Sequence, residues 1–164
     1  MDDKIYNVLF ICTGNSARSI LAEGLMNSLG KGRYRAFSAG SQPSGTVNSL
    51  ALAELKSLRI PTDGFRSKSW EEFAQANSPP LDFVFTVCDN AAGETCPVWP
   101  GQPMTAHWGV PDPAAFNGSE EEKKSQFRNA AVTLKRRIEL MLALPLRSLD
   151  ELAIRKEIKD IGTR

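Results

Sequence analysis

Two residues near the start of this sequence have the types and spacing that suit nucleophilic chemistry on an anion. Cys12 and Arg18 belong to the segment Cys-Thr-Gly-Asn-Ser-Ala-Arg-Ser, residues 12–19. An apolar run precedes this segment and an amphipathic one follows it, so we expect a loop between a strand and a helix. Backbone N–H groups of such a loop converge on one anion, and the helix N-terminus adds positive potential. The segment therefore predicts a binding site for a phosphate-like oxyanion.

Each residue type in the loop has a use in such a site. The positive potential is expected to lower the pKa of Cys12, whose thiolate is the nucleophile. The planar guanidinium of Arg18 matches a tetrahedral oxyanion through two hydrogen bonds, and Gly14 permits a tight curl. A buried core cysteine beside a surface arginine is the alternative. The predicted oxyanion-binding residues are Thr13, Gly14, Asn15, Ser16, Ala17, Arg18 and Ser19.

The later pair Asp112-Pro113 supplies a candidate general acid. It lies just beyond a short strand-like run, 104–108. A carboxylic acid in a loop at that point can protonate a departing oxygen. The alternative is an aspartate in an ordinary turn before proline.

Strand-like and helix-like segments alternate along the chain, and they must position these residues. The strand-like runs are 5–11, 34–38, 81–87 and 104–108, and the main helical runs are 16–29, 47–58, 119–144 and 148–162. Ser16 is the expected N-cap of the first helix and Gly30 its stop, while Ser69, Ser119 and Ser148 each begin a capping box. The alternation predicts βαβ units and a mostly parallel sheet, which binds ligands at the carboxyl ends of its strands.

The composition predicts one globular domain. The 164 residues carry a net charge of +1, and 41% of them are hydrophobic. No basic stripe or long apolar run indicates a nucleic-acid or membrane partner. We expect residues 1–146 to form the domain and residues 147–164 to be a helical extension, which docks on the domain or binds a partner. The first ten residues lack the features of a secretory signal, which predicts a cytoplasmic protein.

The loop 12–19 together with Asp112-Pro113 resembles the low-molecular-weight protein tyrosine phosphatase family, over about residues 5–143. The resemblance implies a three-layer α/β fold, in which a four-stranded parallel sheet has flanking helices. It also implies that Cys12 is the nucleophile, that Arg18 clamps the oxyanion and that Asp112 is the general acid.

Two further cysteines point to one branch of that family. Cys88 and Cys96 flank a run of small and polar residues directly after the run 81–87. This layout resembles the arsenate reductases built on the phosphatase fold. The resemblance implies that Cys12 attacks arsenate, that Cys88 then attacks the adduct, and that Cys96 takes over the disulfide. Thioredoxin, or a glutaredoxin, is the implied reductant of that disulfide.

The alternative function is a phosphatase that hydrolyses phosphate monoesters through a Cys12 phosphocysteine. Cys88 and Cys96 are then buried structural cysteines. Ala114 and Ala115 favour the reductase, because eukaryotic phosphatases of the family place aromatic residues after Asp-Pro to hold a phosphotyrosine ring. Weak phosphatase activity is compatible with the arsenate reductase function, since arsenate and phosphate share the binding loop.

No cofactor or metal site is expected. A zinc site needs a fourth ligand beyond the three cysteines, and the sequence has a single histidine and no Cys-x-x-Cys motif. Three other conspicuous residues are expected to pack rather than to react: His107, Trp99 and Trp108.

A set of polar residues is expected to support the loop. Asn15 resembles the asparagine that braces the loop in the phosphatase family, with Ser38 as its hydrogen-bonding partner. Some relatives bind potassium there through an Asn, a Glu, a Ser and an Asp. Asn15, Glu23 and Ser38 match three of these ligands, and Lys68 stands at the fourth position. The loop is therefore expected to be supported either by a potassium ion or by the Lys68 ammonium group in its place.

Overall fold

A four-stranded parallel sheet forms the centre of the computed structural model, which describes residues 4–89 and 99–164. The strands β1 (Tyr6–Ile11), β2 (Tyr34–Ala39), β3 (Phe83–Thr86) and β4 (Met104–His107) have the spatial order β2-β1-β3-β4. All neighbouring pairs are parallel, as the alternating pattern predicts. Cys96, the expected third member of the thiol relay, lies outside the described residues.

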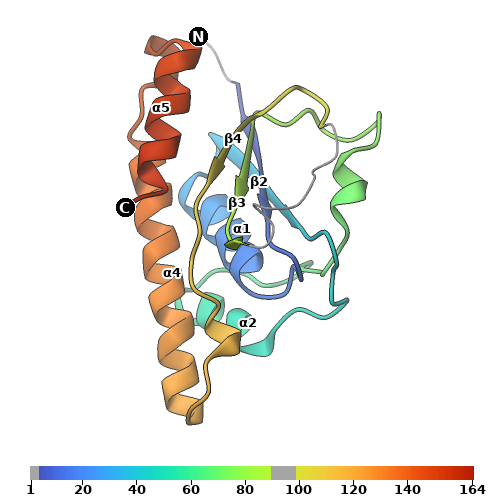
Figure 1. Ribbon diagram of the computed structural model, residues 1–164, viewed down its shortest axis with the longest axis vertical. Coiled ribbons are helices and arrows are strands. Elements are labelled where there is room, and N and C mark those ends of the chain that lie inside the picture. Colours follow the sequence, from blue (N-terminus) through green and yellow to red (C-terminus); the bar gives the residue numbers. More distant parts are fainter. Residues whose placement is uncertain (1–3, 90–98) are drawn as a thin grey trace.

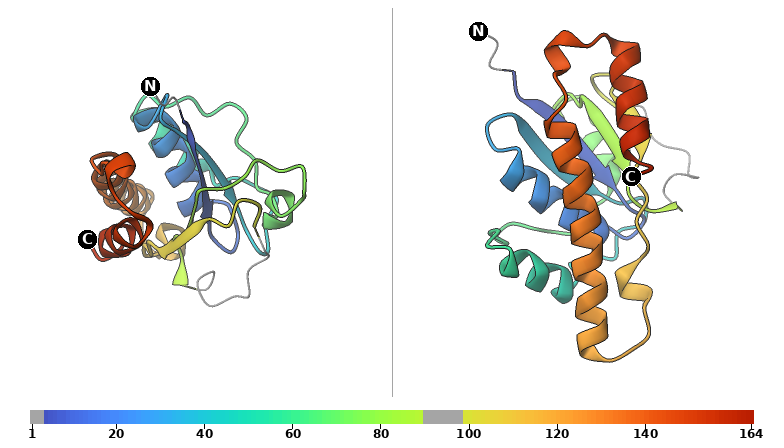
Figure 2. Two further views of the ribbon diagram at one scale, coloured as in Figure 1. Left: turned by 90° about the horizontal axis from the view of Figure 1, so that it is seen from above. Right: turned by 90° about the vertical axis from the view of Figure 1, so that its left-hand side faces the viewer.

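Helices lie on both sides of this sheet, which gives three layers. The main helices are α1 (Arg18–Leu29), α2 (Ser49–Ser57), α4 (Glu120–Leu142) and α5 (Glu151–Ile161). Figure 1 shows α4 and α5 on one side of the strands, and the short helix η1 (Trp70–Phe73) on the other. The view from above in Figure 2 shows the same layers. The predicted α/β class, parallel sheet and flanking helices are confirmed.

Three helix starts differ from the sequence-based prediction. Ser69 caps η1 by accepting from the Glu71 N–H, in place of the Glu72 N–H that the predicted capping box requires. Helix α1 has Ala17 as its N-cap, with no capping side chain, in place of Ser16. Its first N–H groups are therefore left without a side-chain cap, as an anion-binding helix end requires. Helix α5 is capped by Asp150, which accepts from the Ala153 N–H, because Ser148 belongs to the preceding short helix η3 (Leu146–Ser148). By contrast, Ser119 forms the predicted capping box of α4.

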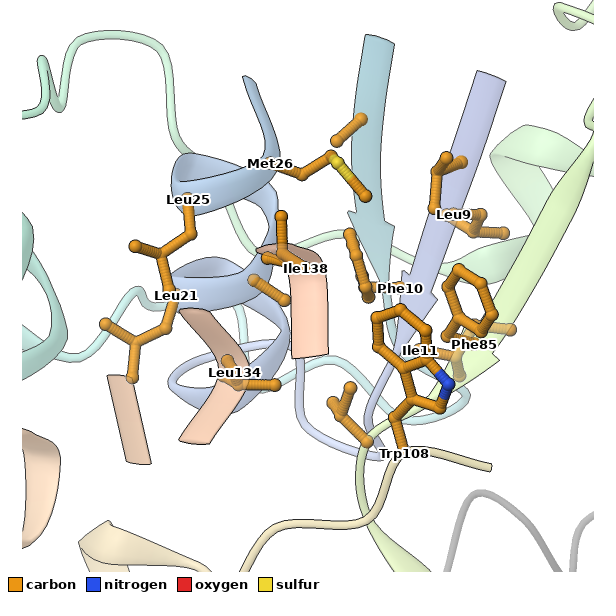
Figure 3. Packing of buried hydrophobic residues seen from close by; sticks show 14 of the residues in the cluster. Leu9, Phe10, Ile11, Leu21, Leu25, Met26, Phe85, Trp108, Leu134 and Ile138 are labelled. Atoms are coloured by element: carbon orange, nitrogen blue, oxygen red, sulfur yellow. The ribbon is translucent and has the colours of Figure 1, made fainter. Parts of the chain in front are cut away.

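The core packs aromatic side chains of the sheet against aliphatic side chains of the helices. Trp108 is fully buried and stacks on Phe85, with ring centroids 3.9 Å apart. Figure 3 shows Phe10 beside these two rings, Met26 of α1 pointing toward the strands, and Leu21 and Leu25 on the opposite side of that helix. Trp108 directly follows β4, so the core fixes the start of the loop that leads to Asp112.

The C-terminal residues pack on the same side as α4. Ile154, Ile158 and Ile161 of α5 are buried, whereas Leu152 on the other side of the helix is 79% exposed. The Trp108 indole N–H donates to the carbonyl oxygen of Ile158 at 2.9 Å. Within the described residues, no helix is long and apolar enough to cross a membrane.

Candidate active site

The loop after β1 curls around Asn15, a residue that sequence reasoning assigned to bracing. Asn15 is fully buried and has a positive φ of 45°. Its side-chain amide donates to Ser19 Oγ at 2.8 Å and to Ser38 Oγ at 3.0 Å, and its side-chain oxygen accepts from the Lys68 backbone N–H at 2.9 Å. These three bonds tie the loop to α1, to β2 and to the segment before η1. The left-handed backbone of Asn15 is strained for most residues, and the bonds hold it.

Gly40 is a loop-supporting residue that the sequence analysis missed. A Cβ atom at this position would lie 2.4 Å from the carbonyl oxygen of Thr13 and 2.7 Å from that of Cys12. Only glycine therefore permits the end of β2 to approach the loop so closely. The available signal was its place directly after the strand that carries Ser38.

A buried ion pair lies next to this brace. The Ser38 hydroxyl donates to the carboxylate of Glu23, and Lys68 Nζ lies 3.9 Å from Glu23 Oε1. Burial raises the pKa of Glu23, while the Ser38 hydrogen bond and the Lys68 charge oppose that rise. Burial likewise lowers the pKa of Lys68, against the attraction of Glu23. An ammonium group already supplies positive charge to this carboxylate, so the residues do not fit a potassium ion.

Arg18 reaches from the start of α1 to the loop that carries Asp112. Its Nη1 donates to the carbonyl oxygen of Val110 at 2.9 Å, and its Nη2 lies 3.6 Å from Asp112 Oδ2. Its Nε is buried, with no hydrogen-bond partner among the described residues. Nε and Nη2 form the side of the guanidinium that grips an oxyanion with two parallel bonds. Arg18 is thus anchored by one nitrogen and presents the others to the site.

The two carboxylate oxygens of Asp112 have different partners: one accepts a backbone hydrogen bond and the other faces Arg18. Its Oδ1 accepts from the Ala114 N–H at 3.0 Å and so caps the short helix η2 (Pro113–Ala115). The side chain is 40% exposed. A cavity of about 480 Å³ lies between the loops after β3 and β4, lined by Arg18, Cys88, Asp89, Gly109, Val110, Pro111 and Asp112. The structure brings the candidate acid and clamp together at the carboxyl edge of the sheet.

Cys88 meets the loop 12–19 directly. The Thr13 backbone N–H donates to Cys88 Sγ at 3.3 Å, and both Cys12 and Cys88 are buried. A hydrogen bond with Cys88, the largest cause, and burial raise the pKa of Cys12, against the charge of Arg18. The predicted lowering of the Cys12 pKa is therefore wrong for this arrangement. Two thiols in contact titrate as a pair, and loss of the first proton holds back the second.

His107 differs from the expected packing residue. Its Nε2 is 2.7 Å from Asp89 Oδ1, its Nδ1 is 2.8 Å from Thr86 Oγ1, and its side chain is 41% exposed. It links β4 to the residue after Cys88. Trp99, expected to pack, is buried with its ring 6.1 Å from that of Trp70. Among the described residues, no cluster of three His, Cys, Asp or Glu side chains is placed to hold a metal ion.

Comparison with known proteins agrees with this geometry. Residues 7–155 match the family model described as low molecular weight phosphotyrosine protein phosphatase. Arsenate reductase of Halalkalibacterium halodurans is 33% identical over 138 residues, which is 84% of this chain and 94% of that protein. Arsenate reductase of Bacillus subtilis is 35% identical over 128 residues, 78% of this chain and 87% of that protein. A solved arsenate reductase in its phosphate-binding state superposes with a TM-score of 0.65 at 28% identity, covering 84% of this chain and 97% of its own.

Proposed function

Since this chain belongs to the low molecular weight phosphotyrosine protein phosphatase family, we propose that it reduces arsenate to arsenite with three cysteines acting in turn. The relatives named arsenate reductase support this assignment. The observation that carries it is the position of Cys88, whose sulfur accepts an N–H of the loop next to Cys12. A phosphatase needs no second thiol there, whereas a reductase needs one within reach of its nucleophile.

The loop 12–19 and Arg18 bind arsenate in the first step. The Cys12 thiolate attacks arsenic, an S–As bond forms, and one arsenate oxygen leaves. Asp112 protonates that oxygen, so it departs as water or hydroxide, not as an oxide. The positive charge of Arg18 and the loop N–H groups offset the charge of the oxyanion throughout. Arsenic stays in its pentavalent state at this stage.

Electron transfer takes place in the second and third steps. The Cys88 thiolate attacks Cys12 Sγ, the S–As bond breaks, and its electron pair leaves with arsenic as arsenite. Two thiols have then become a Cys12–Cys88 disulfide, which balances the two-electron reduction. Cys96 attacks Cys88 and releases Cys12, and the resulting Cys88–Cys96 disulfide takes two electrons from an external dithiol. We assign that role to thioredoxin, with a glutaredoxin as the competitor, in a reducing cytoplasm.

The phosphatase reaction is the second candidate, because the same loop, Arg18 and Asp112 serve it. Phosphate would transfer from a monoester to Cys12, and water would hydrolyse the phosphocysteine. Ala114 and Ala115 supply no aromatic surface for a phosphotyrosine ring. We therefore expect slow hydrolysis of aryl phosphates beside efficient reduction of arsenate.

Single-turnover mapping of disulfides tests the relay. Without reductant, the wild-type protein should carry Cys88–Cys96 after one turnover, with Cys12 free. The Cys96→Ser variant should release one equivalent of arsenite and stop as Cys12–Cys88, because each disulfide forms only when its thiolate reaches the preceding sulfur. The Cys88→Ser variant should stop before arsenite leaves by this route.

Two results would overturn the assignment. If both serine variants sustain wild-type multiple-turnover reduction with thioredoxin and its reductase, an external thiol resolves Cys12 and the relay is wrong. If the wild-type protein forms no arsenite with thioredoxin, glutaredoxin or a small dithiol but hydrolyses an aryl phosphate, the phosphatase function replaces it. Comparing the three reductants at equal concentration identifies the donor.

A further inference from the structure

A buried arginine outside the loop 12–19 contacts the segment that carries the candidate acid. Arg137, on the long helix α4, is 7% exposed, and its Nη1 donates to the carbonyl oxygen of Gly109 at 2.9 Å. Figures 1 and 2 show α4 running beside the segment that follows β4. Its neighbour Arg136 is exposed and instead binds the carbonyl oxygen of Arg164. The two adjacent arginines therefore bind different segments: Arg136 binds the C-terminal residue, and Arg137 binds the segment that leads to Asp112.

Among the described residues, no carboxylate explains the burial of the Arg137 charge. No acidic side chain there acts on its pKa, and its buried Nε has no hydrogen-bond partner. Burial and the nearby charge of Arg136 lower the pKa of Arg137. Burying an unpaired charge costs free energy, so this residue weakens the fold relative to an apolar side chain of similar size. Stability therefore does not account for an arginine at this position, and its hydrogen bond to the Gly109 carbonyl oxygen suggests a different role.

Two guanidinium groups bind consecutive carbonyl oxygens of this segment. Arg18 binds that of Val110 and Arg137 binds that of Gly109, both at 2.9 Å. The Val110 N–H also donates to the carbonyl oxygen of Val87 at 3.0 Å. In the proposed function Arg18 also binds the oxyanion, so its guanidinium divides its hydrogen bonds between the substrate and Val110. Arg137 lines no part of that cavity and is anchored in a long helix, so it is a fixed point that substrate does not reach.

We propose that Arg137 is a positioning residue for the general acid, holding Gly109 so that Asp112 keeps its place while Arg18 grips the oxyanion. The proposal rests on the role of Asp112 as the acid in the proposed function. It extends the site to a residue that neither touches substrate nor belongs to the loop 12–19. Without Arg137, the Gly109 carbonyl loses its donor, and proton donation to the leaving oxygen becomes less efficient.

The test compares aryl phosphates with good and poor leaving groups, because only a poor leaving group needs the acid. Arg137→Met removes the charge and the donors at similar size, Arg137→Lys keeps the charge, and Arg136→Met is the matched control. We expect Arg137→Met to lower kcat/KM, which reports cleavage of the ester, about tenfold on phenyl phosphate and less than about twofold on 2,4-dinitrophenyl phosphate. Arg137→Lys should recover part of the loss, and Arg136→Met should leave both rates unchanged. Asp112→Asn gives the full effect of losing the acid.

A purely structural role predicts a different pattern, in which both esters slow in parallel with the loss of folded protein. That result, or unchanged rates for both esters, would overturn the proposal. Hydrogen exchange of the Gly109, Val110 and Asp112 amides adds a readout that needs no activity and applies also if only Arg137→Lys folds. These amides should exchange faster in the Arg137 variants and not in Arg136→Met, and equal protection in all would refute the proposal. Ester hydrolysis uses neither Cys88 nor Cys96, so failure of the relay leaves this test intact.

Discussion

At the scale of single residues, the two sulfur atoms decide when the site is reactive. Cys88 Sγ accepts a hydrogen bond from the Thr13 N–H and bonds to the Cys12 thiol, so the proposed resolving cysteine favours the protonated form of the proposed nucleophile. An entering oxyanion competes for the loop N–H groups. Reactivity of Cys12 therefore depends on the place of Cys88 as much as on the positive field of the loop.

Removing Cys88 should lower the pKa of Cys12. The hydrogen bond with Cys88 is the largest cause that raises this pKa, and the charge of Arg18 and the Gly14 N–H, which lower it, remain. A raised thiol pKa moves the thiolate, and so the alkylation rate, to higher pH. In Cys88→Ala the midpoint of iodoacetamide labelling of Cys12 should therefore shift to lower pH than in the wild type. The same midpoint in both proteins would show that Cys88 does not control Cys12, and Cys96→Ala serves as the control.

The roles of residues that are close together in the sequence could be predicted, whereas roles that depend on contacts between distant segments could not. The oxyanion site in the loop 12–19 could be predicted because its backbone N–H groups, thiol and guanidinium all come from eight consecutive residues. The contact between Arg137 and Gly109 joins residues 28 positions apart. Nothing in the pattern around residue 137 marks it, and only its buried place on α4 does. The reversed pKa of Cys12 has the same origin, since Cys88 comes from a different strand end.

At the scale of elements, the loop depends on how α1 and β2 are joined beneath it. Glu23 of α1 contacts Ser38 of β2, and Ser38 contacts Asn15 in the loop. Lys68 contacts both ends of this chain of side chains: its backbone N–H donates to Asn15, and its ammonium group lies near Glu23. The match of Asn15, Glu23 and Ser38 to a cation site was readable from sequence. The start of α1 at residue 18 was not, because it depends on the loop's curl.

Replacing Lys68 with methionine should make stability depend more strongly on pH through Glu23. Burial already raises the pKa of Glu23, and loss of the Lys68 charge raises it further. A carboxyl group with a raised folded-state pKa favours the native state below its unfolded-state pKa, and that advantage disappears as pH rises through the folded-state pKa. Lys68→Met should thus lose stability relative to the wild type at neutral pH, and the gap should narrow towards acidic pH.

Urea denaturation of the two proteins from acidic to neutral pH measures that gap. Glu23→Gln combined with Lys68→Met is the control, because it removes the buried carboxylate and should abolish the pH dependence. A gap that stays constant across the range would mean that Lys68 contributes packing and not charge.

Lys68→Asp supplies a fourth oxygen ligand, so potassium should stabilise that variant and leave the wild type unchanged.

At the scale of the whole molecule, residues 147–164 meet the fold at the start of the segment that leads to Asp112. Trp108 packs on Phe85 in the core and donates to Ile158 in α5, and a Cβ atom on Gly162 would lie 2.2 Å from the His107 carbonyl oxygen. We propose that these residues are part of the one domain and that α5 supports the sheet edge at β4. The amphipathic pattern predicted a helix here. Its buried side is formed by Ile154, Ile158 and Ile161 at i, i+4 and i+7 spacing, and Leu152, two residues before Ile154, lies on the opposite side.

If α5 belongs to the domain, damage to its buried side should lower the stability of the whole molecule. Ile158 is fully buried, so Ile158→Ala should cost about 2–5 kcal/mol of unfolding free energy through lost burial and the cavity left behind. Leu152→Ala on the exposed side of the same helix is the control, and should change stability by less than about 0.5 kcal/mol. Urea denaturation followed by tryptophan fluorescence, which includes the core residue Trp108, and by far-ultraviolet circular dichroism measures both.

The two signals should change in one coincident transition in every variant, because a single cooperative domain unfolds at once. A separate early loss of helical signal, with the fluorescence transition of Ile158→Ala unmoved, would show that α5 folds apart from the sheet and would return the C-terminal helix to the partner-binding alternative.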